Sequence, residues 1–139
     1  MGNRSRPLTL INPAGLYDPT ANGYSHVASI AAGSRMVYVA GQGGETDDGA
    51  LAPDFRSQVR QGLRNLGIAL AAARAGFADV AKLTVLIVDH SEQRLQVFGE
   101  ELAIAFGDAA KPTCTLIPVP RLALDGMLFE VEAVAVLPA

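Results

Sequence analysis

The strongest constraint on the fold is an apolar run near the C-terminus, residues 127–137, which is interrupted by Glu130 and Glu132. Because side chains alternate across a β-strand, both glutamates project from one face together with Leu128 and Val134. A carboxylate among apolar neighbours has to be solvated, paired or protonated, since an unpaired buried charge is costly. The run therefore predicts a strand with a candidate site on one face.

Hydrophobic periodicity indicates further strands and two helices. Apolar residues at steps of three and four predict a helix over 54–75, ended by Gly76, and a second helix from a Ser91 cap to Gly107. The short connection 32–34 favours a hairpin between the strands on either side of it. The expected strands are 8–11, 24–31, 35–40, 82–88, 113–119 and 127–137.

This order predicts an α+β fold in which both helices cover one face of a mixed sheet. The 139 residues fit a single domain, 1–139, and leave no third layer for the opposite face. In the strand 82–88, Leu83 and Val85 alternate with the equally apolar Leu86 and Val88. We therefore expect a homo-oligomer with its sheets facing inward.

Composition argues against several classes of function. The formal net charge is −3, so no overall basic field would attract nucleic acid. No run approaches the ~20 apolar residues that cross a bilayer. The first seven residues carry charge without a following apolar region, and Arg6 stands where a myristoylation signal needs Ser or Thr. We expect a soluble cytoplasmic protein without a membrane or nucleic-acid partner.

Cys114 is the one cysteine, which excludes an internal disulfide and gives no support to a cysteine-based metal cluster. As a nucleophile it would need a base, but His26 and His90 lie in distant segments. A buried or pocket-lining thiol is the favoured interpretation. Two histidines without a clustered carboxylate motif are weak evidence for a metal site, so we expect no metal.

Each polar candidate has a structural alternative. Glu130 could act as a general acid or base, or pair with a basic side chain at an interface. Tyr24 could point its hydroxyl into a site or be an ordinary strand residue. Arg121 could meet a substrate carboxylate or a strand glutamate, and structural pairing is favoured. The stripe of Arg56, Arg60 and Arg64 is best interpreted as a solvated outer helix face.

Several short motifs, taken in order, resemble the Rid family, also called the YjgF family. The motifs are Asn22-Gly23-Tyr24-Ser25, Val39-Ala40-Gly41-Gln42, Gln58-Val59-Arg60-Gln61, Lys82-Leu83-Thr84-Val85, Lys111-Pro112-Thr113-Cys114-Thr115 and the strand from Phe129 to Val136. The resemblance implies a chorismate-mutase-like fold, usually a homotrimer, with pockets at the subunit interfaces. It also implies cofactor-free hydrolysis of reactive imines and enamines to a carbonyl compound and ammonia.

Carried over by motif, Glu130 resembles the glutamate that activates water, and Tyr24, Gly41 and Cys114 resemble pocket residues. Three positions depart from the family pattern. Ala40 replaces a usual serine, the pocket asparagine has no clear counterpart beyond Gln96, and Pro112 occupies the place of the arginine that grips a substrate carboxylate. Proline cannot replace that bidentate contact.

Two functions therefore stay open. The protein could hydrolyse an imine or enamine that is not a standard 2-imino acid, with Arg121 or no cation meeting the substrate. Alternatively, it could bind a small metabolite without turnover, as a regulatory or protective trimer. General ribonuclease activity, a third role attached to this family, is disfavoured by the acidic charge.

Overall fold

A computed structural model describes residues 6–139; the expectation about a leader segment falls mainly on residues 1–5, which lie outside the described part. The strands are β1 (Leu8–Ile11), β2 (Val27–Ile30), β3 (Arg35–Gln42), β4 (Val80–Val88), β5 (Thr113–Val119) and β6 (Phe129–Leu137). The helices are α1 (Phe55–Ala72) and α2 (Glu92–Phe106). Two 3₁₀ turns lie at Thr20–Asn22 and Phe77–Asp79.

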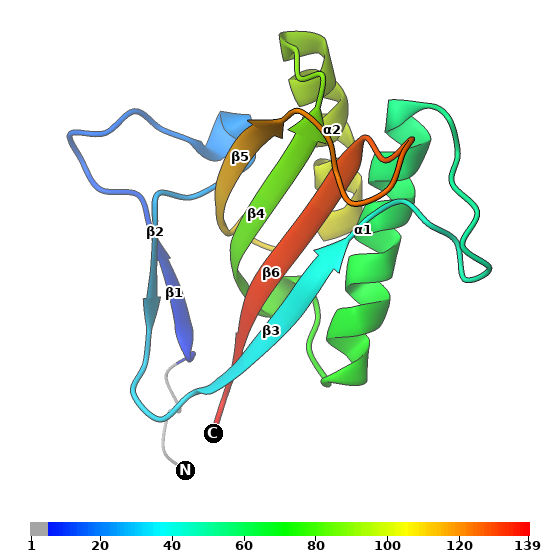
Figure 1. Cartoon of the computed structure of the whole chain (residues 1–139). Helices are drawn as coiled ribbons and strands as arrows, with labels where there is room; N and C mark the ends of the chain where they lie inside the picture. The colour runs from blue at the N-terminus through cyan, green and yellow to red at the C-terminus, as the bar shows by residue number, and fades with distance from the viewer. Residues whose placement is uncertain (1–5) are drawn as a thin grey trace.

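Four strands form a mixed sheet in the order β3-β6-β4-β5. β4 and β5 are parallel, whereas β6 is antiparallel to both of its neighbours. Both helices pack on the same side of this sheet, as Figure 1 shows. The predicted α+β architecture, with two helices on one face of a mixed sheet, is confirmed.

The predicted hairpin between residues 24–31 and 35–40 is wrong. β2 pairs with β1 in a separate two-stranded ribbon, and β3 pairs with β6. The residues before β2 are held elsewhere: Ser25 donates its backbone N–H to the Pro112 carbonyl at 3.0 Å and its hydroxyl to the Lys111 carbonyl at 2.8 Å. A short connection permits a hairpin but does not require one when each strand has a better partner.

Helix capping explains most of the helix boundaries. The Asp54 carboxylate accepts a hydrogen bond from the Ser57 N–H at 3.0 Å, and the Ser91 hydroxyl accepts from the Arg94 N–H at 3.1 Å. α2 ends at Gly107, as predicted. α1 ends earlier than predicted, because Arg74 adopts a φ of 60° before Gly76 is reached.

The core lies between the helices and the sheet. Leu63, Leu66 and Leu70 of α1 are almost fully buried against the inward-facing residues of β4 and β6. Alternate residues of both strands contribute, which is the period-two pattern expected of a sheet with one covered face. The buried residues of these strands include Leu83, Val85, Ile87, Phe129 and Val131.

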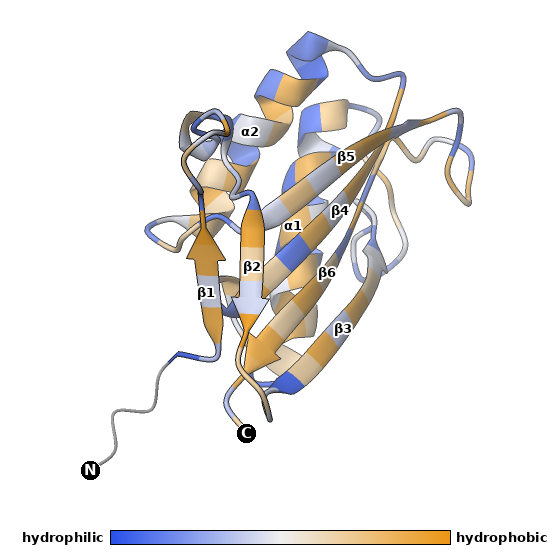
Figure 2. Cartoon of the chain, turned by 90° about the vertical axis from the view of Figure 1, so that its left-hand side faces the viewer, coloured by the Kyte–Doolittle hydropathy of each residue, from blue (hydrophilic) through white to orange (hydrophobic). Residues whose placement is uncertain are grey.

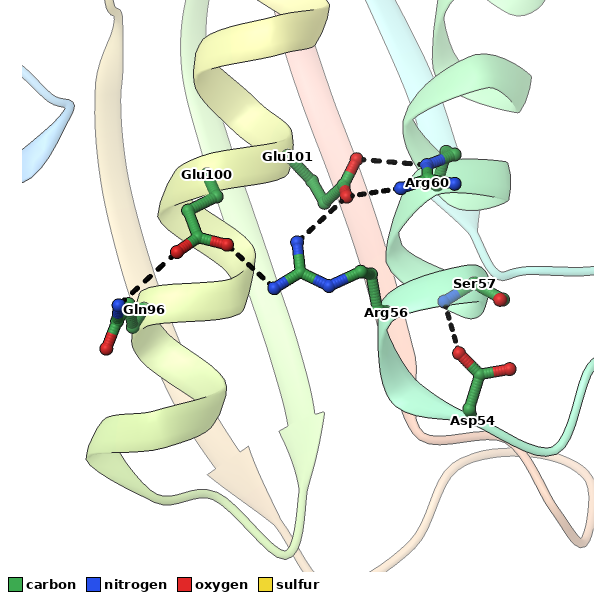
Figure 3. Close-up of polar contacts among 7 residues, drawn as sticks. All are labelled: Asp54, Arg56, Ser57, Arg60, Gln96, Glu100 and Glu101. Carbon is green, nitrogen blue, oxygen red and sulfur yellow. Dashed lines mark hydrogen bonds and ion pairs between the residues drawn. The ribbon is translucent and has the colours of Figure 1, made fainter.

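The arginine stripe on α1 is not the free outer face that we expected. Arg56 and Arg60 both reach across to Glu101 of α2, with shortest nitrogen to oxygen distances of 3.1 Å and 2.9 Å (Figure 3). Arg56 also binds Glu100 at 2.7 Å. Because the Glu101 side chain is only 2% exposed, these ion pairs lie at the contact between the two helices and link them.

The opposite face of the sheet is largely uncovered. Figure 2 looks onto this open face, with the β1–β2 ribbon in front of it and the helices behind. The Tyr38 side chain on β3 is 78% exposed, and Ile117 on β5 is 43% exposed. Among residues 6–139, no helix is long and apolar enough to span a bilayer.

Candidate functional site

Glu130 and Gly41 meet on the open face of the sheet. Val131 faces the core, so its neighbour Glu130 projects to the other side, where it pairs in register with Leu86 of β4. The register between β3 and β6 shifts between Val39 and Gln42, which marks a bulge that includes Gly41. A Cβ placed on Gly41 would collide with the Glu130 carboxylate and lie 3.0 Å from its Cγ. Glycine is therefore what admits the carboxylate here.

The Glu130 carboxylate has no charged partner in the described chain. The ion pairs of residues 6–139 involve Glu100, Glu101 and Asp125 as their acids. Glu130 is partly buried, whereas Glu132, two residues along the same face, is exposed. A half-buried carboxylate without a cation is available to accept a proton or a hydrogen bond from a ligand.

A second acid, Glu45, lies close to the same run of glycines, and sequence reasoning missed it. Gly44, two residues beyond the end of β3, packs on Gln58 of α1. A Cβ on Gly43 would lie 2.7 Å from the Glu45 carboxylate and 2.8 Å from the Met127 methyl group. No motif signals this contact, because the Glu45 side chain folds back along its own segment.

Tyr24 lies far from Glu130 within one chain. Its ring packs edge-on against Tyr17 and His26, with centroid distances of 6.4 Å and 5.6 Å. The next residue, Ser25, bridges to Thr113 at the start of β5, whereas Glu130 pairs near the end of β4. These positions differ by four residues along β6, or ~13 Å. One copy of the chain therefore does not bring Tyr24 and Glu130 together.

Cys114 has its side chain on the helix side of the sheet. It pairs in register with the fully buried Leu83 and packs against the hydrophobic core. Burial raises the pKa of the Cys114 thiol to about 11. The side chain is thus a neutral core group on the face opposite Glu130, and only the backbone of Cys114 is close to the open side.

Arg121 and Gln96 are engaged away from Glu130. Arg121 lies in the loop between β5 and β6, where its guanidinium binds Asp125 at 3.0 Å and the Leu122 carbonyl at 3.2 Å. Gln96 donates to Glu100 on the outer surface of α2 at 3.3 Å. With these partners, neither side chain contributes a polar group to the open face.

Gln58 positions the site without entering it. Its buried amide donates to the carbonyls of Ala52 and Gly126 at 2.8 Å and 2.9 Å and accepts from the Leu128 N–H at 2.8 Å. These bonds hold the loop before β6 against α1 and so fix the start of β6, where Glu130 is the second residue. A glutamine in an apolar helix stripe is the sequence signal that could have indicated such a role.

An open cleft of about 670 Å³ lies beside α1 at the β3 edge of the sheet. It is bordered by Gln42, Glu45, Arg64 and Asn65, among others. Asn65 holds its rim by donating to the carbonyls of Gly43 and Glu45 at 3.0 Å and 2.8 Å. In the described part of the chain, no three His, Cys, Asp or Glu side chains cluster suitably for a metal ion.

A family model described as Endoribonuclease L-PSP matches residues 17–137. YjgH, a RutC family protein of Escherichia coli (strain K12), is 33% identical over 130 residues, covering 94% of this chain and 95% of the relative. The chain belongs to the Rid (YjgF) family. A Rattus norvegicus relative named 2-iminobutanoate/2-iminopropanoate deaminase is 34% identical over 106 residues, or 73% of each chain.

Solved Rid structures agree with the fold. YyfB of Yersinia pestis, a Rid family protein, has a TM-score of 0.89 at 32% identity, covering 94% of this chain and 99% of its own. E. coli TdcF, solved with bound serine, has a TM-score of 0.66 at 29% identity, and the match covers 77% of this chain and 84% of TdcF. The expected family and its fold are thereby confirmed.

Proposed function

We propose that this Rid family protein hydrolyses a reactive imine or enamine metabolite to a carbonyl compound and ammonia, with Glu130 as the catalytic residue. The observation that carries the proposal is the Glu130 carboxylate, which stands over the Cβ-free Gly41 without a charged partner among residues 6–139. Two relatives in the family, from Rattus norvegicus and Mus musculus, are named 2-iminobutanoate/2-iminopropanoate deaminases.

In the proposed reaction the imine is protonated on nitrogen, and Glu130 accepts a proton from water as the water oxygen bonds to the imine carbon. The electron pair of the C=N bond moves to nitrogen, which gives a neutral carbinolamine. The protonated Glu130 then gives its proton to the carbinolamine nitrogen, and the C–N bond breaks to release ammonia. The Glu130 carboxylate takes up the hydroxyl proton as the carbonyl forms and passes it to solvent. An enamine enters the same path after tautomerisation to the imine. These steps need no cofactor or metal.

Completion of the pocket requires a second copy of the chain. Tyr24 and the start of β5 lie at one end of the sheet and Glu130 at the other, so neighbouring subunits can supply the two halves. We accordingly propose a cytoplasmic, single-domain homotrimer with its ligand at the subunit interface. In such a pocket, Tyr24 would bind substrate through its hydroxyl and Cys114 through its backbone. We do not assign substrate to Arg121, which is held by Asp125.

Pro112 favours a second candidate function, binding of a small metabolite without turnover. The arginine implied at this position by the family resemblance would anchor a substrate carboxylate, and proline has no side-chain donor. A ligand without that anchor could sit in the pocket in an unreactive pose. The description Endoribonuclease L-PSP names another activity. We do not favour it, because the net charge is −3 and the site faces solvent with carboxylates.

The test uses free imines generated in the cuvette by flavin-dependent oxidases, with semicarbazide competing for the imine. Hydrolysis by the protein lowers the yield of semicarbazone relative to buffer. We expect hydrolysis of at least one imine, and loss of it in Glu130→Gln. Saturable ligand binding without acceleration of any imine would instead support the non-catalytic function.

A further inference from the structure

The cleft beside α1 carries charges of both signs that do not neutralise each other. Arg64 borders it from α1, whereas Glu45 and Asp47 border it from the loop that follows β3. No ion pair joins Arg64 to either acid among residues 6–139, so its nitrogens lie more than 4.0 Å from their carboxylate oxygens. The cleft thus holds a cation and two anions that are not in contact with one another.

The acid of the neighbouring helix does not occupy Arg64 either. Arg64 and Glu101 both border the groove between the two helices. Glu101, however, accepts its hydrogen bonds from Arg56 and Arg60. These two arginines satisfy the buried carboxylate, and the Arg64 guanidinium stays available to a ligand in the cleft.

Hydrogen bonds hold the rim of the cleft in place. The Asn65 amide donates to the Glu45 carbonyl at 2.8 Å and accepts from the Gln61 amide at 2.9 Å, which fixes the loop against α1. A backbone bridge between Glu45 and Leu51 closes the loop that carries Asp47. The cleft is therefore formed before a ligand arrives, as small-molecule sites usually are.

The cleft also has the size and the apolar surface that a small ligand needs. Its volume of about 670 Å³ lies within the usual range of ligand pockets. Ile68, which borders the cleft, is 62% exposed and follows Arg64 by four residues, so both side chains lie on one face of α1. An apolar group and a cation thus stand side by side in the cleft.

We propose that this cleft is a second ligand site, which binds a small zwitterion of the α-amino-acid type with an aliphatic side chain. Arg64 binds the ligand carboxylate, Glu45 and Asp47 accept hydrogen bonds from its ammonium, and its side chain packs on Ile68. A simple anion would face two carboxylates and a simple cation would face a guanidinium, whereas a zwitterion meets complementary charge at both ends. The site is separate from Glu130, which does not border the cleft.

Three probes of the same carbon skeleton separate the two charges. L-Leucine carries both, 3-methylbutylamine lacks the carboxylate, and 4-methylpentanoate lacks the ammonium. Binding of each is measured by isothermal titration calorimetry at pH 7. Arg64→Gln removes the cation of the cleft, and the double variant Glu45→Gln/Asp47→Asn removes both acids. Arg121→Gln, which removes an exposed guanidinium that does not border the cleft, is the control.

We expect leucine to bind with a dissociation constant of about 1 mM, and each analogue to bind at least about tenfold more weakly. Arg64→Gln and the double variant should each weaken leucine by about tenfold, and Arg121→Gln should not change it. Absence of saturable binding at about 20 mM leucine would overturn the inference. So would equal binding of either analogue, or leucine affinity that survives Arg64→Gln or the double variant.

Glu130→Gln separates this site from the pocket of the proposed hydrolysis. Since Glu130 does not border the cleft, leucine should bind this variant as it binds the wild type. Weaker leucine binding in Glu130→Gln would place the amino acid in the other pocket and overturn the assignment of a second site. Because binding is measured without turnover, the inference stands or falls independently of imine hydrolysis.

Discussion

At the residue scale, the site depends on Gly41, a position with no side chain. The Glu130 carboxylate occupies the volume that a Cβ on Gly41 would fill, so the strand bulge and the glycine together define where that acid stands. Misplacement of a catalytic group by about 1 Å can cost ~100-fold in rate. The glycine therefore has a positional role rather than a chemical one.

Gly41→Ala should reduce imine hydrolysis by about tenfold or more, because the new methyl group displaces Glu130. Gly99→Ala is the matched control, since a Cβ there meets nothing within 4 Å and Gly99 lies inside α2. That control should keep full activity and gain up to about 1 kcal/mol in unfolding free energy. Equal activity of the two variants would show that the contact with Gly41 is unimportant.

Cys114 should behave as an inert core thiol. Since burial raises its pKa to about 11, the thiolate is scarce at neutral pH and forms only as pH rises toward that value. We expect an aromatic disulfide reagent at pH 8 to label the native protein far more slowly than the unfolded chain. Cys114→Ala should retain imine hydrolysis. Rapid native labelling, or loss of activity without unfolding, would return the thiol to the site.

At the scale of elements, the two helices are joined by charge as well as by apolar packing. Glu101 of α2 accepts from Arg60 at 2.9 Å and 3.2 Å and from Arg56 at 3.1 Å. The Arg60 hydrogen bond, followed by that of Arg56, lowers the pKa of Glu101, and desolvation opposes them. This link stabilises the layer that supports β6.

Glu101→Gln should lower the free energy of unfolding by about 1–2 kcal/mol at pH 7, measured by urea denaturation, because it removes a buried partner of two guanidinium groups. Glu100→Gln, an exposed neighbour that binds Arg56, should cost less. Since the folded pKa of Glu101 lies below the unfolded one, its contribution is present above the unfolded value and is lost as pH falls through the folded one. The difference between wild type and Glu101→Gln should shrink in acid; a constant difference would contradict this.

Sequence patterns predicted the elements better than their partners. Asp54 and Ser91 are local capping signals, so both helix starts were predictable. The strand partners were not, because no residue pattern showed that β2 pairs with β1 and β3 with β6, or that Ser25, just before β2, binds a carbonyl 86 residues away in sequence. Strand alternation predicted that Glu130 and Glu132 share one face, but it did not predict that this face is the open one. The contact between Glu130 and Gly41 depends on a β-bulge that the residue types do not predict. The contact of the Glu45 carboxylate with Gly43 was missed because it, too, depends on local backbone geometry that the residue types do not predict.

At the scale of the whole molecule, the open face of the sheet governs both assembly and function. It carries exposed apolar side chains and Glu130 together, while Tyr24 lies beside the start of β5, toward the opposite end of the sheet. Burial of such a face against another copy would remove apolar surface from water, at about 25 cal/mol per Å². Assembly would at the same time complete the pocket.

Tyr38→Glu should therefore prevent assembly, because it places a charge on the open face, where the Tyr38 side chain of the edge strand β3 is 78% exposed. Analytical ultracentrifugation should give a trimer for the wild type and a smaller species for the variant. Ile104→Glu, a 74% exposed position on the helix side, is the matched control and should stay trimeric. A monomeric wild type would refute the proposed assembly.

The most direct test of the central claim compares Glu130→Gln with Glu132→Gln in imine hydrolysis by the assembled protein. Both substitutions remove one carboxylate from the same face of β6, two residues apart, and neither acid has an ion pair among residues 6–139. We predict that kcat falls at least about 100-fold in Glu130→Gln and stays near wild type in Glu132→Gln. Equal activity of the two variants would contradict the account.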